Sequence, residues 1–298
     1  MNPLPYLKKP NMFSNVSIPP SFSLLRKGKV LLLLKEEFKD ILLQKGICDF
    51  ETFLNTHDQT TRYLSGRTPH PSLPLTGEKR MIIRQYSHGG LLRAFTKNLF
   101  LFGSRSFREL ALTEEIRSCG IPTIQPIGAI HRSVPPFFYR AHLLSLEIPE
   151  ALNLVQYIQK TRTRSSEGFS SRRKTLRSIG LLLKRFHDAG FFHRDLQIKN
   201  ILVVGDQPLL IDFDRSYRRP VLSRRKRIKN LLRLNRSAEK WRRAGLYMTR
   251  TDRWRLFSAY GEGDEEILKA MKKACRTYPI RLFFYRCSWA LRQLIEGN

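Results

Sequence analysis

Short apolar runs bounded by polar residues and glycines dominate the first half of the chain, whereas longer stretches with helical spacing dominate the second half. An apolar run of about six residues between turn signals is typical of a strand. The first half also contains two helical patterns, at 36–45 and 107–119, which stop at Gly46 and before Gly120, where glycine commonly ends a helix. The predicted strands of this half are 29–34, 81–86, 124–131 and 137–146. The pattern therefore predicts a β-rich first half.

The second half predicts helices with one short β-rich interruption. We expect an amphipathic helix at 176–189, ended by Gly190, and a closing helix at 265–275. The segment 161–174 is polar and basic, and it predicts a mobile loop. His187 falls within the first of these helices, and we expect it to be structural, packed beneath the loop that follows.

The interruption holds the most specific pattern in the chain. It reads as a loop at 191–200, an apolar strand at 201–204, a turn at Gly205-Asp206 and a second strand at 209–211 that ends in an acid. His193-Arg194-Asp195, with Asn200 five positions after the aspartate, has the spacing of a kinase catalytic loop, H-R-D-x-x-x-x-N. Ile211-Asp212-Phe213-Asp214 stands where a kinase carries D-F-G.

These residue types suit phosphoryl transfer from ATP. Asp195 would accept the proton of the attacking hydroxyl, and Asn200 and Asp212 would hold Mg²⁺ through oxygen atoms. The alternative is a surface β-hairpin whose polar residues fall into this order by chance. Several polar residues at matching offsets, interleaved with two apolar strands, favour the kinase-like core.

The nucleotide-binding residues are expected in the first half. Arg84 lies on the strand that carries the phosphate-binding lysine in kinases; it could clamp phosphates, or it could be an exposed edge-strand arginine. Glu109 is the candidate partner of that cation, or else a solvated helix residue. Leu64-Ser65-Gly66-Arg67 could form the glycine turn over the phosphates, with Gly66 at its centre, although the following residues do not resemble a glycine-rich loop.

The charge of the chain points to a polyanionic partner. Lys and Arg number 54 against 25 Asp and Glu, a net charge of +29, which favours nucleic acid, an anionic membrane or a glycolipid. Much of the excess falls in a basic amphipathic helix or helix pair within 215–255, where no A-P-E motif of a protein-kinase activation segment is present. Leu31–Leu34 is too short to span a bilayer, no targeting signal is visible, and the scattered cysteines fit a reducing cytosol.

The catalytic-loop and Asp212 motifs, the stretch Arg84–Leu91 and the helix Asn230–Ser237 together resemble the Kdo kinases of the lipopolysaccharide-core kinase family, a branch of the protein-kinase-like superfamily. The resemblance runs from about Lys29 to near the C-terminus. It implies an α+β, bilobal protein-kinase-like fold with a small β-rich N-lobe and a larger, mainly helical C-lobe. The expected divisions are an irregular arm at 1–28, a nucleotide-binding N-lobe at 29–148 and a catalytic C-lobe at 149–298.

The same resemblance implies the function. Kdo kinases use ATP to phosphorylate a Kdo sugar of Kdo–lipid A at the cytoplasmic face of the inner membrane of Gram-negative bacteria. It also implies Asp195 as the base and Asn200 and Asp212 as Mg²⁺ ligands. Because the basic helix follows the metal-binding strand, we expect Arg224, Arg225 and Arg227 to bind the anionic acceptor. Such an acceptor explains the positive charge without nucleic acid. A heptose or other core-sugar kinase is the nearest alternative; an atypical RIO-like kinase bound to ribosomes, or a basic RNA-binding protein, is the alternative from another class.

Overall fold

The computed structural model describes residues 16–50, 52–53, 60–64, 70–87, 98–162 and 166–276. The chain divides into two compact units. The first comprises 1–149 together with 213–216, and the second comprises 150–212 and 217–298. The short segment Phe213–Ser216 therefore belongs to the first unit although its chain neighbours on both sides belong to the second.

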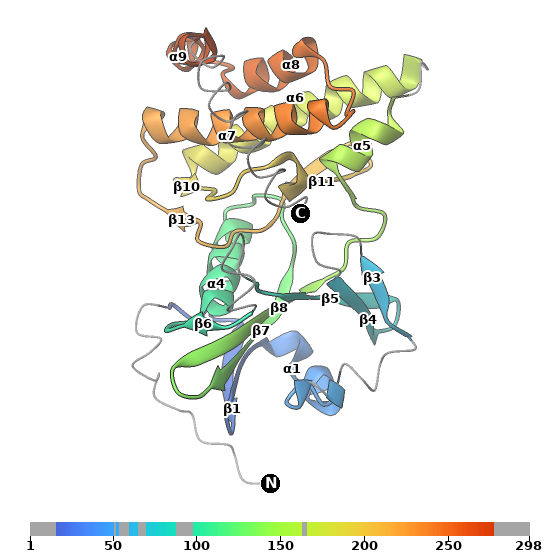
Figure 1. Cartoon of the computed structure of the whole chain (residues 1–298), viewed down its shortest axis with the longest axis vertical. Helices are drawn as coiled ribbons and strands as arrows, with labels where there is room; N and C mark the ends of the chain where they lie inside the picture. The colour runs from blue at the N-terminus through green and yellow to red at the C-terminus, as the bar shows by residue number, and fades with distance from the viewer. Residues whose placement is uncertain are drawn as a thin grey trace, which may run out of the picture. The chain divides into compact units, whose positions relative to one another are not determined.

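The described strands of the first unit form one antiparallel sheet in the order β1-β2-β7-β8-β5-β4-β3, with β6 paired to β8 (Figure 1). Their bounds are β1 Phe22–Lys27, β2 Val30–Lys35, β3 Arg62–Leu64, β4 His70–Thr76, β5 Lys79–Gln85, β6 Phe100–Leu101, β7 Pro126–Val134 and β8 Phe138–Leu146. Its helices are α1 (Glu36–Gln44) and α4 (Arg105–Ser118). The predicted strands and both predicted helices of this half are confirmed within a few residues.

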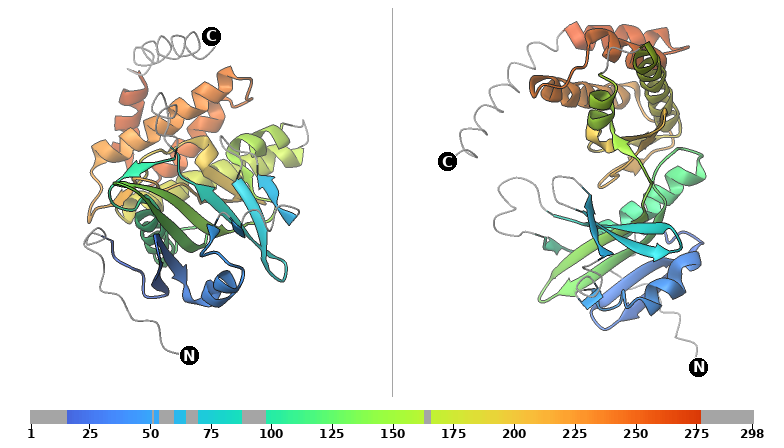
Figure 2. Two further views of the ribbon diagram at one scale, coloured as in Figure 1. Left: turned by 60° about the horizontal axis from the view of Figure 1, so that its bottom comes forward. Right: turned by 90° about the vertical axis from the view of Figure 1, so that its right-hand side faces the viewer.

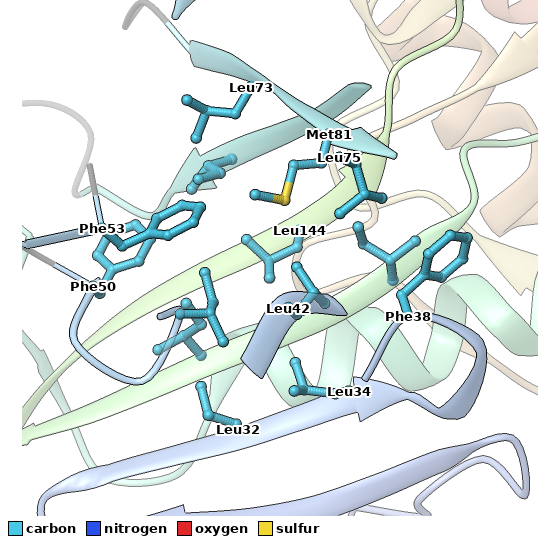
Figure 3. Packing of buried hydrophobic residues seen from close by; sticks show 14 residues of the cluster. Leu32, Leu34, Phe38, Leu42, Phe50, Phe53, Leu73, Leu75, Met81 and Leu144 are labelled. Atoms are coloured by element: carbon cyan, nitrogen blue, oxygen red, sulfur yellow. The ribbon is translucent and has the colours of Figure 1, made fainter. Parts of the chain in front are cut away.

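Apolar residues on both faces of the sheet explain why each face carries a helix. Successive strand residues point to opposite faces, so β2 sends Leu32 and Leu34 into the core shared with α1 and Leu31 and Leu33 into the core shared with α4. Figure 3 shows the first of these cores, where Leu42 of α1 packs over the sheet. The sheet is therefore covered on both faces, and α4 packs against β7 and β8, the second of which pairs with β5.

The N-terminal expectation was wrong in one part. Residues 22–27 of the predicted irregular arm form β1, which pairs with β2 through a turn at Gly28, where φ is 57°. Phe22 is buried in the core that includes residues of α4, and burial of its ring stabilises β1. The polar residues around this segment led the sequence analysis to predict an irregular arm.

The second unit is mainly helical. Its helices are α5 (Leu154–Lys160), α6 (Ser166–Asp188), the short 3₁₀ helix η3 (Ile198–Asn200), α7 (Arg224–Arg243), α8 (Arg250–Tyr260) and α9 (Glu265–Arg276). Its strands are β9 (Leu152–Asn153), β10 (Phe191–Phe192), β11 (Ile201–Val204), β12 (Gln207–Leu210) and β13 (Tyr217–Arg218). In Figures 1 and 2, α6 runs beside α8. Gly180 permits this close approach, because a Cβ atom there would lie 2.3 Å from the carbonyl oxygen of Leu256.

Most of the loop predicted at 161–174 is helical, since α6 begins at Ser166. The polar composition misled the prediction because one basic residue of this segment is internal. Arg172 is buried and donates hydrogen bonds to the Tyr247 carbonyl (2.6 Å) and to Asp252 (2.5 Å). An arginine in such a pair can occupy a helix face that the sequence alone assigns to solvent. The predicted strands at 201–204 and 209–211, by contrast, are confirmed as β11 and β12.

Candidate active site

The predicted catalytic loop lies in the second unit between the buried strand β10 and η3. Hydrogen bonds from other residues of the loop hold both the backbone and the side chain of Asp195. Its backbone carbonyl accepts from Nδ2 of Asn200 (2.9 Å), and its carboxylate Oδ2 accepts from Nε2 of Gln197 (2.6 Å). The side chain of Asp195 is 45% exposed. The loop thus presents a fixed carboxylate toward solvent, as a base that must receive a substrate hydroxyl requires.

His193 supports this loop from below. Its side chain is fully buried, and its Nε2 lies 2.9 Å from the carbonyl oxygen of Ile211. Because a carbonyl can only accept, Nε2 carries the proton, and Nδ1 is the acceptor for the backbone N–H of Asp195 (3.1 Å). Burial lowers the pKa of His193, in agreement with a neutral ring. One imidazole therefore joins the loop that carries Asp195 to the strand end that carries Asp212.

A second buried network lies beneath His193. The side-chain oxygen of Asn230 accepts from the backbone N–H of His193 (3.1 Å), and its Nδ2 donates to the His193 carbonyl (2.7 Å). The same oxygen faces Nε2 of His187 (3.1 Å), whose Nδ1 lies 2.8 Å from the Tyr260 hydroxyl. Burial lowers the pKa of His187 to about 4. His187 is thus the packed structural residue that the sequence predicted.

Asn200 and Asp212 come together at the end of the β11–β12 hairpin. The backbone N–H of Ile211 donates to the carbonyl of Asn200 (3.0 Å), which sets Asp212 beside that residue. Asp212 has φ 66°, a left-handed conformation that is uncommon outside glycine but that aspartate adopts more readily than most residues. Because the amide nitrogen of Asn200 is engaged by Asp195, its amide oxygen can serve as a ligand. One amide oxygen and one carboxylate fit Mg²⁺, which commonly takes few protein ligands and completes its shell with phosphates and water.

In the first unit, Arg84 of β5 forms an ion pair with Glu109 of α4. The Tyr86 hydroxyl donates to the same Glu109 oxygen and accepts from Nη2 of Arg84 (3.0 Å), while the other Glu109 oxygen accepts from the backbone N–H of Phe213 (3.0 Å). The Glu109 side chain is 1% exposed. Burial, and next the Glu109 charge, hold the pKa of Tyr86 well above its usual range. Arg84 lies on an internal strand, β5, between β4 and β8. Arg84 and Glu109 are therefore not solvated surface groups.

Asp214, which replaces the glycine of D-F-G, is also tied to α4. Arg105 donates to both of its carboxylate oxygens, one bond being 3.0 Å from Nε. The guanidinium group of Arg105 also lies over the ring of Phe100, 4.5 Å from its centre. Together with the bond from Phe213 to Glu109, this pair fixes the residues after Asp212 to the helix. The same residues border a cavity of about 780 Å³ in the first unit.

The basic helix α7 contacts the catalytic loop along one face. Asn230, Arg233 and Ser237 follow at helical spacing: Nη1 of Arg233 donates to Oδ1 of Asp195 (2.5 Å), and Ser237 Oγ accepts from the backbone N–H of Ile198 (3.2 Å). Near its start, Arg224 and Arg225 are exposed, with Arg224 3.8 Å from Glu266. Arg227 differs, because it is paired with Asp188 and donates to the Leu222 carbonyl (3.1 Å).

Comparison with known families decides the relationship. Residues 71–260 match the family model described as "Lipopolysaccharide kinase (Kdo/WaaP) family". The chain belongs to this family. The matched range includes every predicted site residue except Gly66, which lies before it and outside the described residues.

Members of the Kdo/WaaP family with curated descriptions resemble part of the chain. The "3-deoxy-D-manno-octulosonic acid kinase" of Vibrio vulnificus (strain YJ016) is 34% identical over 165 residues, which are 54% of this chain and 65% of that protein. The protein of the same name from Pasteurella multocida (strain Pm70) is 31% identical over 163 residues, 52% of this chain and 64% of that protein. The matches thus span less than two thirds of these relatives.

A solved structure titled "WaaP in complex with acyl carrier protein" resembles the chain with a TM-score of 0.51 and 18% identity, covering 83% of this chain and 98% of that one. This similarity concerns the fold, and it confirms the predicted α+β, bilobal protein-kinase-like class. The Kdo/WaaP resemblance predicted from the motifs is confirmed as well.

Sequence reasoning missed several polar residues of this candidate site, among them Tyr86, Arg105, Asn230 and Arg233. Some signals were available. Arg105 precedes Glu109 by one helical turn, and Asn230 and Arg233 share the α7 face that leads to Ser237. Helical spacing shows which residues share a face, but the partners of Arg105, Asn230 and Arg233 lie 37 to 109 residues away along the chain.

Proposed function

We propose that the protein transfers the γ-phosphoryl group of ATP to a hydroxyl of a Kdo sugar on Kdo–lipid A. The observation that carries this proposal is the hydrogen-bonded assembly of Asp195, Asn200 and Ile211-Asp212 around the buried His193, in a chain that belongs to the Kdo/WaaP family. A carboxylate base beside an oxygen-ligand pair is the equipment of phosphoryl transfer to an alcohol.

In the proposed reaction, the oxygen of the acceptor hydroxyl bonds to the γ-phosphorus of ATP, and Asp195 accepts the proton of that hydroxyl. The bond from that phosphorus to the bridging oxygen breaks, and ADP leaves. Gln197 and Asn200 keep the base in place, because they hold its carboxylate and its carbonyl. Mg²⁺ held by Asn200 and Asp212 would neutralise charge on the phosphates. Arg84, oriented by Glu109 and Tyr86, binds the nucleotide phosphates in place of the usual lysine.

The acceptor is an anionic glycolipid, and the positive charge of the chain suits it. At +29, the protein is attracted to lipid A phosphates and to the anionic inner-membrane surface, where it acts peripherally on the cytoplasmic side in a Gram-negative bacterium. Among the described residues, no helix combines the length and apolar content that crossing a membrane requires.

The first turn of α7 supplies part of this charge. Its residues Arg224 and Arg225 are exposed, and basic side chains there oppose the helix dipole, so they do not serve the helix itself. We assign them to the acceptor phosphates or anionic headgroups. Arg227, also predicted to bind the acceptor, is half-buried and paired with Asp188, and its contribution to the acceptor depends on that pair opening.

The direct test incubates purified protein with radiolabelled ATP, Mg²⁺ and Kdo–lipid A, and then locates the phosphate by mass spectrometry. Phosphate on a Kdo hydroxyl is the expected result. A parallel acceptor that also carries heptose separates the sugars, since phosphate on heptose alone would replace Kdo as the substrate. Sedimentation of the protein with ribosomes rather than inner membranes would favour the RNA-bound alternative.

The role of α7 is tested by changing Arg224 and Arg225 together to Gln. The KM for the glycolipid should rise roughly tenfold or more, as expected for two cations worth about 1 kcal/mol each near a charged surface. The KM for ATP should not change. A variant with Arg173 and Arg177 of α6 changed to Gln removes the same charge from other exposed positions and is the matched control. Equal effects in both variants would mean that only net charge matters.

A further inference from the structure

Arg233 of α7 contacts the carboxylate of the proposed base. Its Nη1 donates to Oδ1 of Asp195 at 2.5 Å, while Gln197 serves the other oxygen. The two side chains are 33% and 45% exposed, so the pair lies open to solvent and to an arriving acceptor. A hydroxyl that reaches Asp195 must therefore come within a few ångströms of this guanidinium group.

The pair is not required to hold α7 in place. Exposed ion pairs add little to stability, and α7 is anchored to the same loop by the buried Asn230 and by Ser237. Nor is it required to orient the base, because Gln197 and Asn200 hold Asp195 from within the loop. The guanidinium group of Arg233 is thus available to bind a group of the substrate.

The proton transfer itself creates the need for that contact. Before the reaction, the guanidinium charge is balanced by the Asp195 carboxylate. When Asp195 accepts the proton of the acceptor, that carboxylate becomes neutral, and Arg233 loses its counterion in a site from which bound substrates displace water. A second carboxylate on the acceptor would replace the lost partner, and the planar fork of arginine matches carboxylate geometry.

We propose that Arg233 is a specificity-determining residue that binds the carboxylate of an acidic sugar and so brings a neighbouring hydroxyl to Asp195. This inference rests on the proposed function and goes beyond it, because it assigns the choice of an acidic sugar to one side chain. The nucleotide phosphates are left to Arg84 and to the Asn200–Asp212 pair, which lie on other elements.

The test compares two acceptors, Kdo–lipid A and the same molecule with its Kdo carboxylate converted to the neutral methyl ester. Wild-type protein should prefer the acid by about 10- to 100-fold in kcat/KM, the usual size of a charged-group contact. Arg233→Gln should reduce this preference to within about threefold, mainly through the KM of the acid, with the KM for ATP unchanged. Arg233→Lys, which keeps the charge but not the fork, should give an intermediate preference.

Other outcomes overturn the inference. If Arg233 only positions the base, Arg233→Gln lowers kcat equally for both acceptors and leaves their ratio unchanged. A wild-type protein that does not distinguish the acid from the ester excludes the role without any variant, which matters if Arg233→Gln fails to fold. Arg242→Gln, an exposed position on the same helix paired with Glu239, is the control and should keep the wild-type ratio. Phosphorylation of neither acceptor by wild-type protein would instead refute the proposed function, and the inference with it.

Discussion

Two acidic residues stand at the centre of the proposed chemistry, and their surroundings differ sharply. Glu109 in the first unit is 1% exposed and is surrounded by Arg84, Tyr86 and the backbone of Phe213. The side chain of Asp195 in the second unit is 45% exposed, and its carboxylate accepts hydrogen bonds from the side chains of Gln197 and Arg233.

The difference follows from what each group must meet. Glu109 contacts only protein, so it can be buried once its charge is paired and its oxygens accept hydrogen bonds. In the proposed reaction Asp195 must contact a substrate, which an open carboxylate allows, while its backbone N–H is held by the buried His193. The backbone of Asp195 is thus fixed by hydrogen bonds, while its carboxylate remains accessible to solvent.

The largest expected effect comes from the open site. Asp195→Asn keeps the size of the side chain but cannot accept the acceptor proton, so kcat should fall by about 10²- to 10⁴-fold, the usual contribution of a general base. The KM for ATP should hardly change. Steady-state kinetics measures both, and a variant with more than half of the wild-type turnover would remove Asp195 from this role.

The buried support beneath Asp195 should respond to acid. The pKa of His187 is about 4 when folded and 6.5 in the unfolded chain, because burial disfavours its charged form. The unfolded state therefore binds more protons between these values, and stability that is complete above pH 6.5 is lost as the pH falls. At pH 5, the part of this loss in unfolding free energy that is due to His187 is on the order of 2 kcal/mol.

Urea unfolding at pH 7.5 and pH 5 measures this loss. His187→Gln retains an amide that can donate toward Asn230 but cannot become charged, so the difference between the two pH values should shrink by about that amount. An unchanged difference would show that other groups determine the acid sensitivity.

The metal site should show an effect of intermediate size. Asp212→Asn replaces a carboxylate with a neutral amide and should weaken Mg²⁺–ATP binding about tenfold, which corresponds to 1.4 kcal/mol. Nucleotide titration with and without Mg²⁺ provides the measurement. If the variant retains the wild-type dependence on Mg²⁺, the ion is held by other residues.

The last prediction tests the closed site around Glu109, where the expected change in ATP binding is smaller than for Asp212→Asn. Tyr86→Phe removes the hydroxyl that joins Arg84 to Glu109 and leaves the ring in place. Stability should fall by about 1–3 kcal/mol, the cost of a buried hydrogen bond lost to a charged group, and the KM for ATP should rise more than kcat falls. Tyr139→Phe in the same core is the control; its hydroxyl accepts from the Arg105 backbone but does not contact Arg84 or Glu109. Equal KM changes in both variants would indicate a general loosening of this core.

Sequence patterns were sufficient where interacting residues lie close together in the chain. Asp195, Asn200 and Asp212 fall within one loop and hairpin, so their spacing and the apolar strands between them predicted both the hairpin and their proximity. Arg84 and Glu109 were harder to assign, because a strand arginine and a helix glutamate each have solvated alternatives. The loop predicted at 161–174 failed for a related reason, since the pairing that buries Arg172 involves Asp252, 80 residues later.

By itself, the sequence determined the β-rich first half and the mainly helical second half, the catalytic-loop motif, the excess of positive charge and the resemblance to the Kdo/WaaP family. Only the tertiary structure distinguished arginines that look alike in sequence. Arg84 pairs with Glu109, Arg227 with Asp188 and Arg233 with Asp195, whereas Arg225 is exposed. The physical reason is that the partner of a guanidinium group is the carboxylate that folding brings within about 3 Å. Local sequence spacing does not predict which carboxylate that is, because the partners lie far apart in the chain.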